Sequence, residues 1–378
     1  MSLTIHRFLE GKAFDEGNVR RFLSAHSFPI VENDSLTFVF YGDADGVYLQ
    51  HFIYGLPTSR PFQRVNGSQF WYLVLEIPER SRIQYKFNVV RGADHQWILD
   101  PFNPARAFDP FGANSVCHSR GTERPDWTFH DPEARPGEIS EISLWSEAFH
   151  HERRVRVYLP ARFRRTRRYP LLVVHDGSDY LRFSSLKVVL DNLIHRLEIP
   201  PMIVALTDAG ERLREYPDHP PHARFLAEEL LPRLENDYPL RDEPAARGLM
   251  GASFGGVAAL SCAWRYQGVF GRLLLQSGSF AFTDIGTNQR GPTFEPVVKF
   301  VNAFRETPGR PAERVFISCG TYESLIYENR SLVPVLQKAG MDVRFVEARD
   351  GHNWENWRDR LREGLSWLFP GPLWMVYE

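Results

Sequence analysis

The first hundred residues alternate apolar and polar positions in short runs. The runs LTFVFYG, GVYLQHFI, QFWYLVLEI and IQYKFNVV occupy residues 36–42, 46–53, 69–77 and 83–90. They are rich in β-branched and aromatic residues, and the turn sequences GDADG, NGS and RGAD separate them. Regularly spaced short strands of this kind predict a small β-sandwich.

From about residue 139 the pattern changes to short, continuous apolar runs, among them YPLLVVHDG, PMIVALTD, RLLLQSG and RVFISCG. Amphipathic stretches such as SSLKVVLDNLIHRL lie between them. Strands that alternate with helices predict βαβ units and a mostly parallel sheet flanked by helices. The charged, proline-bearing segment 124–138 separates the two patterns. We therefore expect a sandwich domain over residues 1–135 and an α/β domain over residues 136–378.

Composition and charge exclude several classes of protein. The formal net charge is −2, from 45 basic and 47 acidic residues, so nucleic acid is not an expected partner. A membrane span needs about 18 consecutive apolar residues, and no stretch of the sequence approaches that length. The first residues lack the apolar core of a signal peptide. We expect a cytoplasmic protein without membrane association. The three cysteines are too widely spaced for a disulfide framework or a zinc motif, and Cys262 and Cys319 fit core positions.

One short motif indicates a catalytic residue. Residues 251–255 read G-A-S-F-G, after an apolar strand pattern and before a run compatible with a helix. In that context G-x-S-x-G predicts a nucleophile elbow, a strained turn that lifts the Ser253 hydroxyl out of the sheet edge. The turn also places the serine at a helix N-terminus, where free N–H groups favour a developing negative charge.

A serine nucleophile needs a base, and the base needs an orienting acid. Glu323 follows one predicted strand and His352 follows the next, in the order Ser, acid, His that α/β hydrolases use. Asp350 is the rival acid. We prefer Glu323, because an acid two residues from the histidine could hardly orient the far ring nitrogen.

Two backbone donors are needed for an oxyanion hole. The N–H of Phe254, directly after the nucleophile, is the first candidate. The second is expected around Gly177 and Ser178, in the loop after the strand YPLLVVHDG.

His175 and Asp176 precede that loop, and we expect them to shape it. A metal site formed with His352 is the rival hypothesis, but the spacing is not that of a zinc motif.

These motifs resemble a known family. HDG, GASFGG, CGTYESLIYENRSLVPVLQKAG and DGHNWENWRDRL together look like the esterase D branch of the α/β hydrolases, and within it the enterochelin (ferric enterobactin) esterase-like proteins. The likeness spans roughly residues 139–369. FWYLVLEIP, QYKF and DPFNP extend it loosely into the sandwich, which resembles the immunoglobulin-like early-set domain of that family. It implies that Ser253 is the nucleophile, His352 the base and Glu323 the orienting acid, without a cofactor.

The resemblance leaves the substrate open. A small-molecule ester is expected, with an enterobactin-type siderophore lactone as the first hypothesis. A feruloyl- or acetyl-type carbohydrate ester is the alternative, and a non-catalytic glycan-binding protein on a hydrolase scaffold is a third. Arg212, Arg182 and Trp354 are the candidate substrate-binding residues, with Arg214 a further candidate for an anionic ligand. The oligomeric state stays open.

Overall fold

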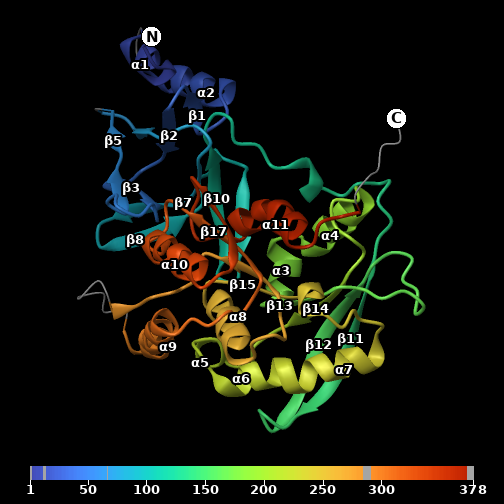
Figure 1. Ribbon diagram of the computed structural model, residues 1–378. Coiled ribbons are helices and arrows are strands. Elements are labelled where there is room, and N and C mark those ends of the chain that lie inside the picture. The colour runs from blue at the N-terminus through green and yellow to red at the C-terminus, as the bar shows by residue number, and fades with distance from the viewer. Residues whose placement is uncertain (1, 12–13, 66, 284–290, 373–378) are drawn as a thin grey trace. The chain divides into compact units, whose positions relative to one another are not determined.

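The computed structural model describes residues 2–11, 14–65, 67–283 and 291–372 (Figure 1). The chain divides into two compact units. The sandwich unit comprises Met1–Glu123 together with two short segments from far along the chain, Thr321–Glu323 and Arg349–Asn353. The α/β unit comprises Arg124–Gly320, Ser324–Ala348 and Trp354–Glu378.

The division after Glu123 lies earlier than the boundary predicted at residue 135. The intervening residues fold with the α/β unit, because Asn192 Nδ2 donates to the carbonyl oxygens of Trp127 (2.9 Å) and Phe129 (2.7 Å). The Trp127 ring is buried in that unit's core.

The sandwich unit contains two antiparallel sheets. The four-stranded sheet has the order β1 (Ile30–Glu32), β2 (Ser35–Tyr41), β6 (Phe70–Glu76), β5 (Gln63–Arg64). The six-stranded sheet has the order β4 (Ser59–Pro61), β3 (Gly46–His51), β7 (Arg82–Arg91), β10 (Gly112–His118), β9 (Arg106–Asp109), with β8 (Asp94–Ile98) paired to β7.

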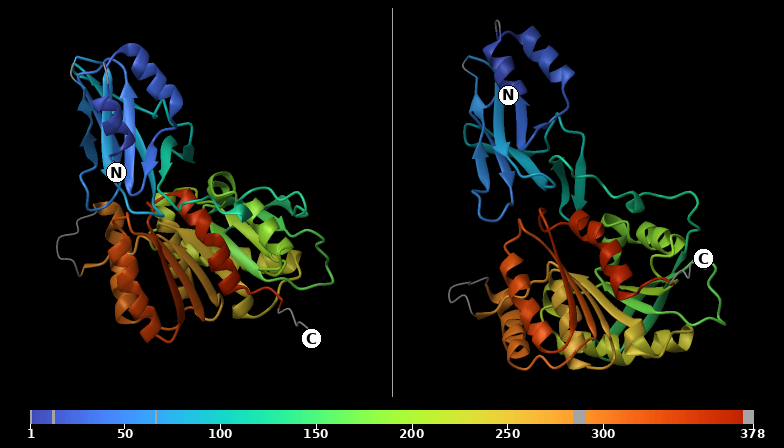
Figure 2. Two further views of the ribbon diagram at one scale, coloured as in Figure 1. Left: turned by 90° about the horizontal axis from the view of Figure 1, so that it is seen from above. Right: turned by 45° about the horizontal axis from the view of Figure 1, so that its top comes forward.

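Alternating side chains of both sheets form one core. Phe38 of β2 packs in the same buried cluster as Leu49 of β3 and Phe87 of β7. The opposite face of β2 and β6 is covered by α1 (Thr4–Glu10) and α2 (Glu16–Ala25), whose Ile5 and Phe22 share a second cluster with other residues of this unit. The predicted β-sandwich is thereby confirmed (Figure 2).

The α/β unit is built on one eight-stranded sheet. Its order is β11 (Glu138–Ser146), β12 (His151–Leu159), β14 (Ile203–Thr207), β13 (Leu171–His175), β15 (Arg247–Ala252), β16 (Arg272–Gln276), β17 (Arg314–Gly320), β18 (Asp342–Ala348). The pairs that involve β12 are antiparallel and the other pairs are parallel. The carboxyl ends of β13 to β18 therefore lie along one edge of the sheet.

Helices cover both faces of this sheet (Figure 2). Neighbouring residues of β13 show the division, since Val173 belongs to one buried cluster and Val174 to the other. The cluster around Val174 takes in α3 (Gly177–Phe183), α4 (Leu186–His195) and α11 (Trp354–Leu368). The cluster around Val173 takes in α6 (Pro220–Arg224), α7 (Leu231–Asp237), α8 (Phe254–Arg265), α9 (Glu295–Glu306) and α10 (Ile326–Lys338).

The remaining helical segments are short. They are α5 (Arg212–Glu215), the π-helical turn Phe225–Leu230 and the 3₁₀ turns Asp126–Thr128, Pro244–Ala246 and Pro292–Phe294. Within the described residues, no helix is long and apolar enough to cross a membrane.

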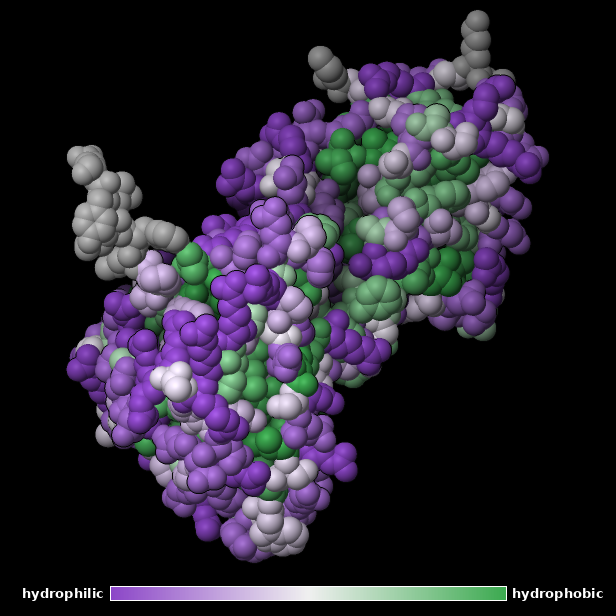
Figure 3. All heavy atoms as spheres, turned by 90° about the vertical axis from the view of Figure 1, so that its right-hand side faces the viewer, coloured by the Kyte–Doolittle hydropathy of each residue, from purple (hydrophilic) through white to green (hydrophobic). Residues whose placement is uncertain are grey.

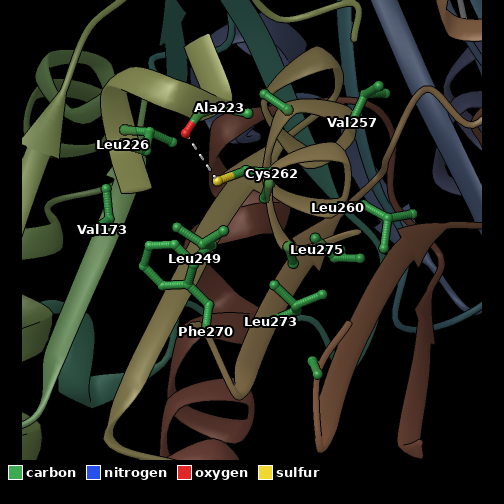
Figure 4. Close-up of a cluster of buried hydrophobic side chains, with 14 of the residues drawn as sticks. Val173, Ala223, Leu226, Leu249, Val257, Leu260, Cys262, Phe270, Leu273 and Leu275 are labelled. Atoms are coloured by element: carbon green, nitrogen blue, oxygen red, sulfur yellow. Dashed lines mark hydrogen bonds between the residues drawn. The ribbon is translucent and has the colours of Figure 1, made fainter. Parts of the chain in front are cut away.

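The three cysteines are buried and form no disulfide bond with one another. Cys262 of α8 lies among Leu226, Leu249 and Phe270, and its Sγ contacts the carbonyl oxygen of Ala223 at 3.8 Å (Figure 4). Burial raises the pKa of the Cys262 thiol, so it behaves as a small apolar side chain, as predicted.

Exposed apolar side chains occur in separate patches on the surface. On the face drawn in Figure 3, polar side chains predominate and apolar ones gather in patches between them. The large exposed apolar side chains include Phe52 (72% exposed) and Phe111 (96%), both in the sandwich unit.

Candidate active site

Ser253 occupies a sharp turn between β15 and α8. Its backbone angles, φ 56° and ψ −123°, lie outside the regions that L-residues favour. The strand ends at Ala252 and the helix begins at Phe254, so the strand–turn–helix context of a nucleophile elbow is present. The Ser253 N–H donates to the carbonyl oxygen of Gln276 in the neighbouring strand (2.9 Å), which anchors the turn.

Both glycines of the motif are closely packed, and at Gly251 no side chain fits. A Cβ at Gly251 would come within 2.3 Å of the carbonyl carbon and oxygen of Gly255. A Cβ at Gly255 would lie 3.2 Å from the Cβ of His175. A side chain at Gly251 would force the turn open, and Ser253 would lose its conformation. At Gly255 the neighbours would need to shift by a few tenths of an ångström.

The Ser253 hydroxyl is half-buried and has a polar neighbour that the sequence analysis missed. Its Oγ lies 3.2 Å from the Oγ of Ser279, and the Ser279 N–H donates to the Ser253 carbonyl oxygen (3.2 Å). Ser279 follows β16, the strand next to β15. The sequence did contain a signal for this neighbour, because Ser279 is a polar residue just past the end of the strand adjacent to β15.

Glu323 and His352 meet in the sandwich unit. Glu323 Oε2 lies 2.7 Å from His352 Nδ1. The Glu323 side chain is 1% exposed, whereas that of His352 is 38% exposed. The two residues closely follow β17 and β18, which are paired up to Gly320 and Ala348. The proximity arises because neighbouring parallel strands end side by side.

Asp350, the rival acid, has other partners. Its Oδ2 lies 2.5 Å from Arg82 Nη2, and its Oδ1 accepts from the Gly351 N–H (2.8 Å) and from Asn353 Nδ2 (2.9 Å). Glu323, not Asp350, is therefore the carboxylate bonded to His352.

Two of the three predicted oxyanion residues lie at helix starts. Phe254 and Gly177 are the first residues of α8 and α3, where backbone N–H groups have no partner within the helix. A Cβ at Gly177 would lie 2.6 Å from the Cβ of Leu206, so only glycine fits there. Ser178, the second residue of α3, differs in that its N–H donates to Asp208 Oδ1 (3.0 Å), and its oxyanion role stays a prediction.

Arg212 is bound to the loop after β13. Its Nε and Nη2 contact the Asp176 carboxylate at 2.8–3.0 Å, and its Nη2 lies 3.5 Å from the carbonyl oxygen of Ala252. Burial raises the pKa of Asp176 and the Arg212 guanidinium opposes that shift. Arg212 is therefore paired with Asp176 and orders this loop, and its role in substrate binding stays a prediction.

Of the other substrate-binding candidates, Arg182 is exposed and lies over the Phe183 ring (4.9 Å). In the part of the chain that the structure describes, no carboxylate lies within ion-pair distance of it. Arg214 is exposed and pairs with Glu211 at 3.6 Å. Both arginines are sited at the surface.

Trp354, the third predicted substrate-binding residue, is largely buried, and its role in binding stays a prediction. It is the first residue of α11 and is 7% exposed. Its ring packs edge-on against Tyr180 (5.1 Å) and Trp357 (4.7 Å). The side chain is part of the buried core of the α/β unit.

His175 is fully buried at the end of β13. Its Nδ1 lies 2.9 Å from the Met250 carbonyl oxygen, and its ring centroid is 5.2 Å from that of His222. Burial lowers the pKa of His175 to about 3, so the imidazole is neutral. Across the described residues, no group of three or more His, Cys, Asp or Glu side chains could hold a metal ion.

A strained serine between a strand and a helix, on a mostly parallel sheet covered by helices, defines the α/β-hydrolase class. The Esterase family model, described as "Putative esterase", matches residues 146–368. That span is more than half of the chain, so the chain belongs to the esterase family and is a carboxylic-ester hydrolase.

Curated relatives and solved structures agree with this assignment. The iron(III) enterobactin esterase of Dickeya dadantii is 29% identical over 366 residues, which cover 88% of this chain and 83% of that protein. The enterobactin esterase of Shigella flexneri, crystallised in the presence of enterobactin, matches with a TM-score of 0.73 at 22% identity, over 95% of this chain and 99% of that one. A ferulic acid esterase of Anaeromyces mucronatus gives a TM-score of 0.52 at 16% identity, over 64% of this chain and 94% of that one. The predicted resemblance to enterochelin esterase-like proteins is confirmed.

Proposed function

We propose that this chain is a serine esterase that uses Ser253, His352 and Glu323, and that its substrate is an enterobactin-type siderophore ester. The observation that carries the catalytic part is the 2.7 Å contact between Glu323 and His352. That pair follows β17 and β18 at the sheet edge where β15 leads into Ser253. The Ser, acid, His order along the chain supports the same assignment.

The chemistry follows from these groups. Glu323 accepts the Nδ1–H of His352, which leaves Nε2 as the basic nitrogen. Ser253 Oγ attacks the ester carbonyl carbon while Nε2 takes the hydroxyl proton. The N–H groups of Phe254 and Gly177 are the proposed donors to the resulting oxyanion.

The tetrahedral intermediate then collapses. The bond to the alkoxide breaks, and the alkoxide takes the proton from His352 and leaves as an alcohol. A water molecule, deprotonated by His352, attacks the acyl-serine ester. The carboxylic acid product leaves and Ser253 regains its proton.

The extent of the sequence match supports the substrate. The 29% identity to the Dickeya enzyme extends over 366 residues and so includes the sandwich as well as the α/β unit. A sandwich that forms part of the matched region fits a role in the same reaction. The exposed, unpaired Arg182 is a candidate contact for an anionic ferric catecholate.

The first test is hydrolysis by the wild type and by Ser253→Ala. The substrates are an iron-loaded enterobactin-type trilactone, a feruloyl or acetyl oligosaccharide and a short-chain p-nitrophenyl ester. Ser253→Ala should lower kcat by at least roughly a thousandfold, because the covalent intermediate cannot form. Circular dichroism and the thermal unfolding midpoint should match the wild type.

Comparison of the three substrates distinguishes a siderophore esterase from a carbohydrate esterase and from a non-catalytic binding protein. The proposal expects kcat/KM for the trilactone to exceed that for the sugar esters by roughly a hundredfold. The reverse ratio would make the protein a carbohydrate esterase. No hydrolysis of any ester and no labelling of Ser253 by a fluorophosphonate would leave a glycan-binding protein and overturn the catalytic assignment.

A further inference from the structure

The two segments that contain Glu323 and His352 fold with the sandwich unit rather than with the strands they follow. Ser81 forms a parallel bridge with Arg349, and the Arg82 N–H donates to the Arg349 carbonyl oxygen (3.0 Å). The segment that contains His352 therefore pairs with the chain at the start of β7.

An ion pair fixes that segment further. Arg82 and Asp350 are in contact at 2.5 Å, and their side chains are only 4% and 5% exposed. The same carboxylate accepts from the Gly351 N–H and from Asn353 Nδ2. One buried carboxylate therefore binds groups on both sides of His352 in the chain, which restricts the backbone that orients the imidazole.

The Glu323 segment has its own attachments to the same unit. The Tyr322 hydroxyl lies 2.6 Å from Ser81 Oγ, and the Tyr322 carbonyl oxygen accepts from the Tyr54 N–H (2.9 Å). The Tyr322 N–H donates to the Asp350 carbonyl oxygen (3.1 Å), which joins the two segments. Adjacent residues of the sandwich, Ser81 and Arg82, thus fix the acid and the base together.

We propose that Arg82 and Asp350 are positioning residues for ester hydrolysis, through which the sandwich holds His352 against Glu323. This inference rests on the proposed function. A buried ion pair contributes little net stability compared with apolar residues of the same volume. It does impose directed contacts, which an apolar pair cannot, and orientation is what a catalytic histidine requires.

The test is a double-mutant cycle of Arg82→Met and Asp350→Asn, with kcat and KM measured on the best ester. Each single variant should lower kcat by between roughly tenfold and a hundredfold with little change in KM. The double variant should lose no more than the worse single variant, because both act through one contact. Arg82→Lys, which keeps the charge but not the forked geometry, should fall between wild type and Arg82→Met.

A second double-mutant cycle tests whether Arg82 acts through the contact between His352 and Glu323. In a Glu323→Gln background, where the proposed acid is already lost, Arg82→Met should have much less effect on kcat than in the wild type. A purely structural role for Arg82 would lower kcat by the same factor in both backgrounds, and that result would overturn the inference.

Tyr85→Phe is the matched control on the same strand. It removes a buried hydrogen bond to Asp100 Oδ2 (2.7 Å) that lies wholly within the sandwich. It should lower the thermal midpoint and leave kcat unchanged. Wild-type kcat in folded Arg82→Met would also refute the inference, while activity in Ser253→Ala would instead refute the proposed function.

Discussion

At the scale of single residues, burial sets the protonation of the histidines near the loop after β13. His175 and His222 are both buried, and desolvation is the main cause of the lowered pKa of each. Among the described residues, the carboxylate paired with His222, on Glu215, is 3.8 Å away, which is longer than the 2.7 Å contact of His352. The two rings are neutral packing groups.

This burial predicts acid sensitivity. The folded pKa of His175, about 3, lies below the usual histidine value of 6.5, so the unfolded chain binds more protons between those values. Stability should therefore fall as pH drops from 6.5 toward 3, by at most about 1.4 kcal/mol per pH unit for each such histidine. The measurement is the free energy of unfolding in urea at several pH values.

His175→Asn keeps a donor toward the Met250 carbonyl oxygen and removes the titrating ring. It should reduce the pH slope, even though it lowers the absolute stability, and His222→Asn should act in the same direction. An unchanged slope in both variants would contradict the assignment of acid sensitivity to these rings.

At the scale of elements, the strand–elbow–helix unit depends on how α8 packs. The helix lies on the sheet through Val257 and Leu260, next to Leu249 and Leu275 (Figure 4). Ser253 caps the same helix, so a shift of α8 would move the nucleophile.

Leu260→Ala tests this packing. Leu260 is fully buried, so the variant should lower the free energy of unfolding by about 2–5 kcal/mol. Leu213→Ala is the control, because Leu213 is 62% exposed and its loss should change stability by no more than about 0.5 kcal/mol. Chemical denaturation gives both values, and equal losses would show that α8 packing is not the cause.

At the scale of the whole molecule, the two units are not contiguous in sequence. The sandwich unit takes in Thr321–Glu323 and Arg349–Asn353, each of which follows a strand of the other unit's sheet. Cooperative unfolding units follow hydrogen bonds and packing rather than chain order.

Native-state hydrogen exchange tests the division. The amides of Arg82 and Tyr322, whose acceptors are Arg349 and Asp350, should share the opening free energy of β7. Their exchange should respond to urea as the sandwich amides do. Exchange of Tyr322 in step with the β17 amides would place it in the α/β unit instead.

Much of the architecture was predictable from local pattern. The switch from alternating to continuous apolar runs reports which faces of a strand are buried, and that separated the sandwich from the parallel sheet. G-x-S-x-G between a strand and a helix predicted the strained turn at Ser253, because its determinants are a few adjacent residues.

The partners of individual polar side chains required the fold. Asp350 pairs with Arg82, Ser178 with Asp208 and Arg212 with Asp176, and each pair is distant in sequence. Periodicity reports burial but not which polar groups meet, so the sequence could not show that the Ser178 N–H bonds to Asp208. The attachment of the His352 segment to the sandwich could not be predicted for the same reason. The strand pairing between residues 81 and 349 arises only when distant parts of the chain pack together.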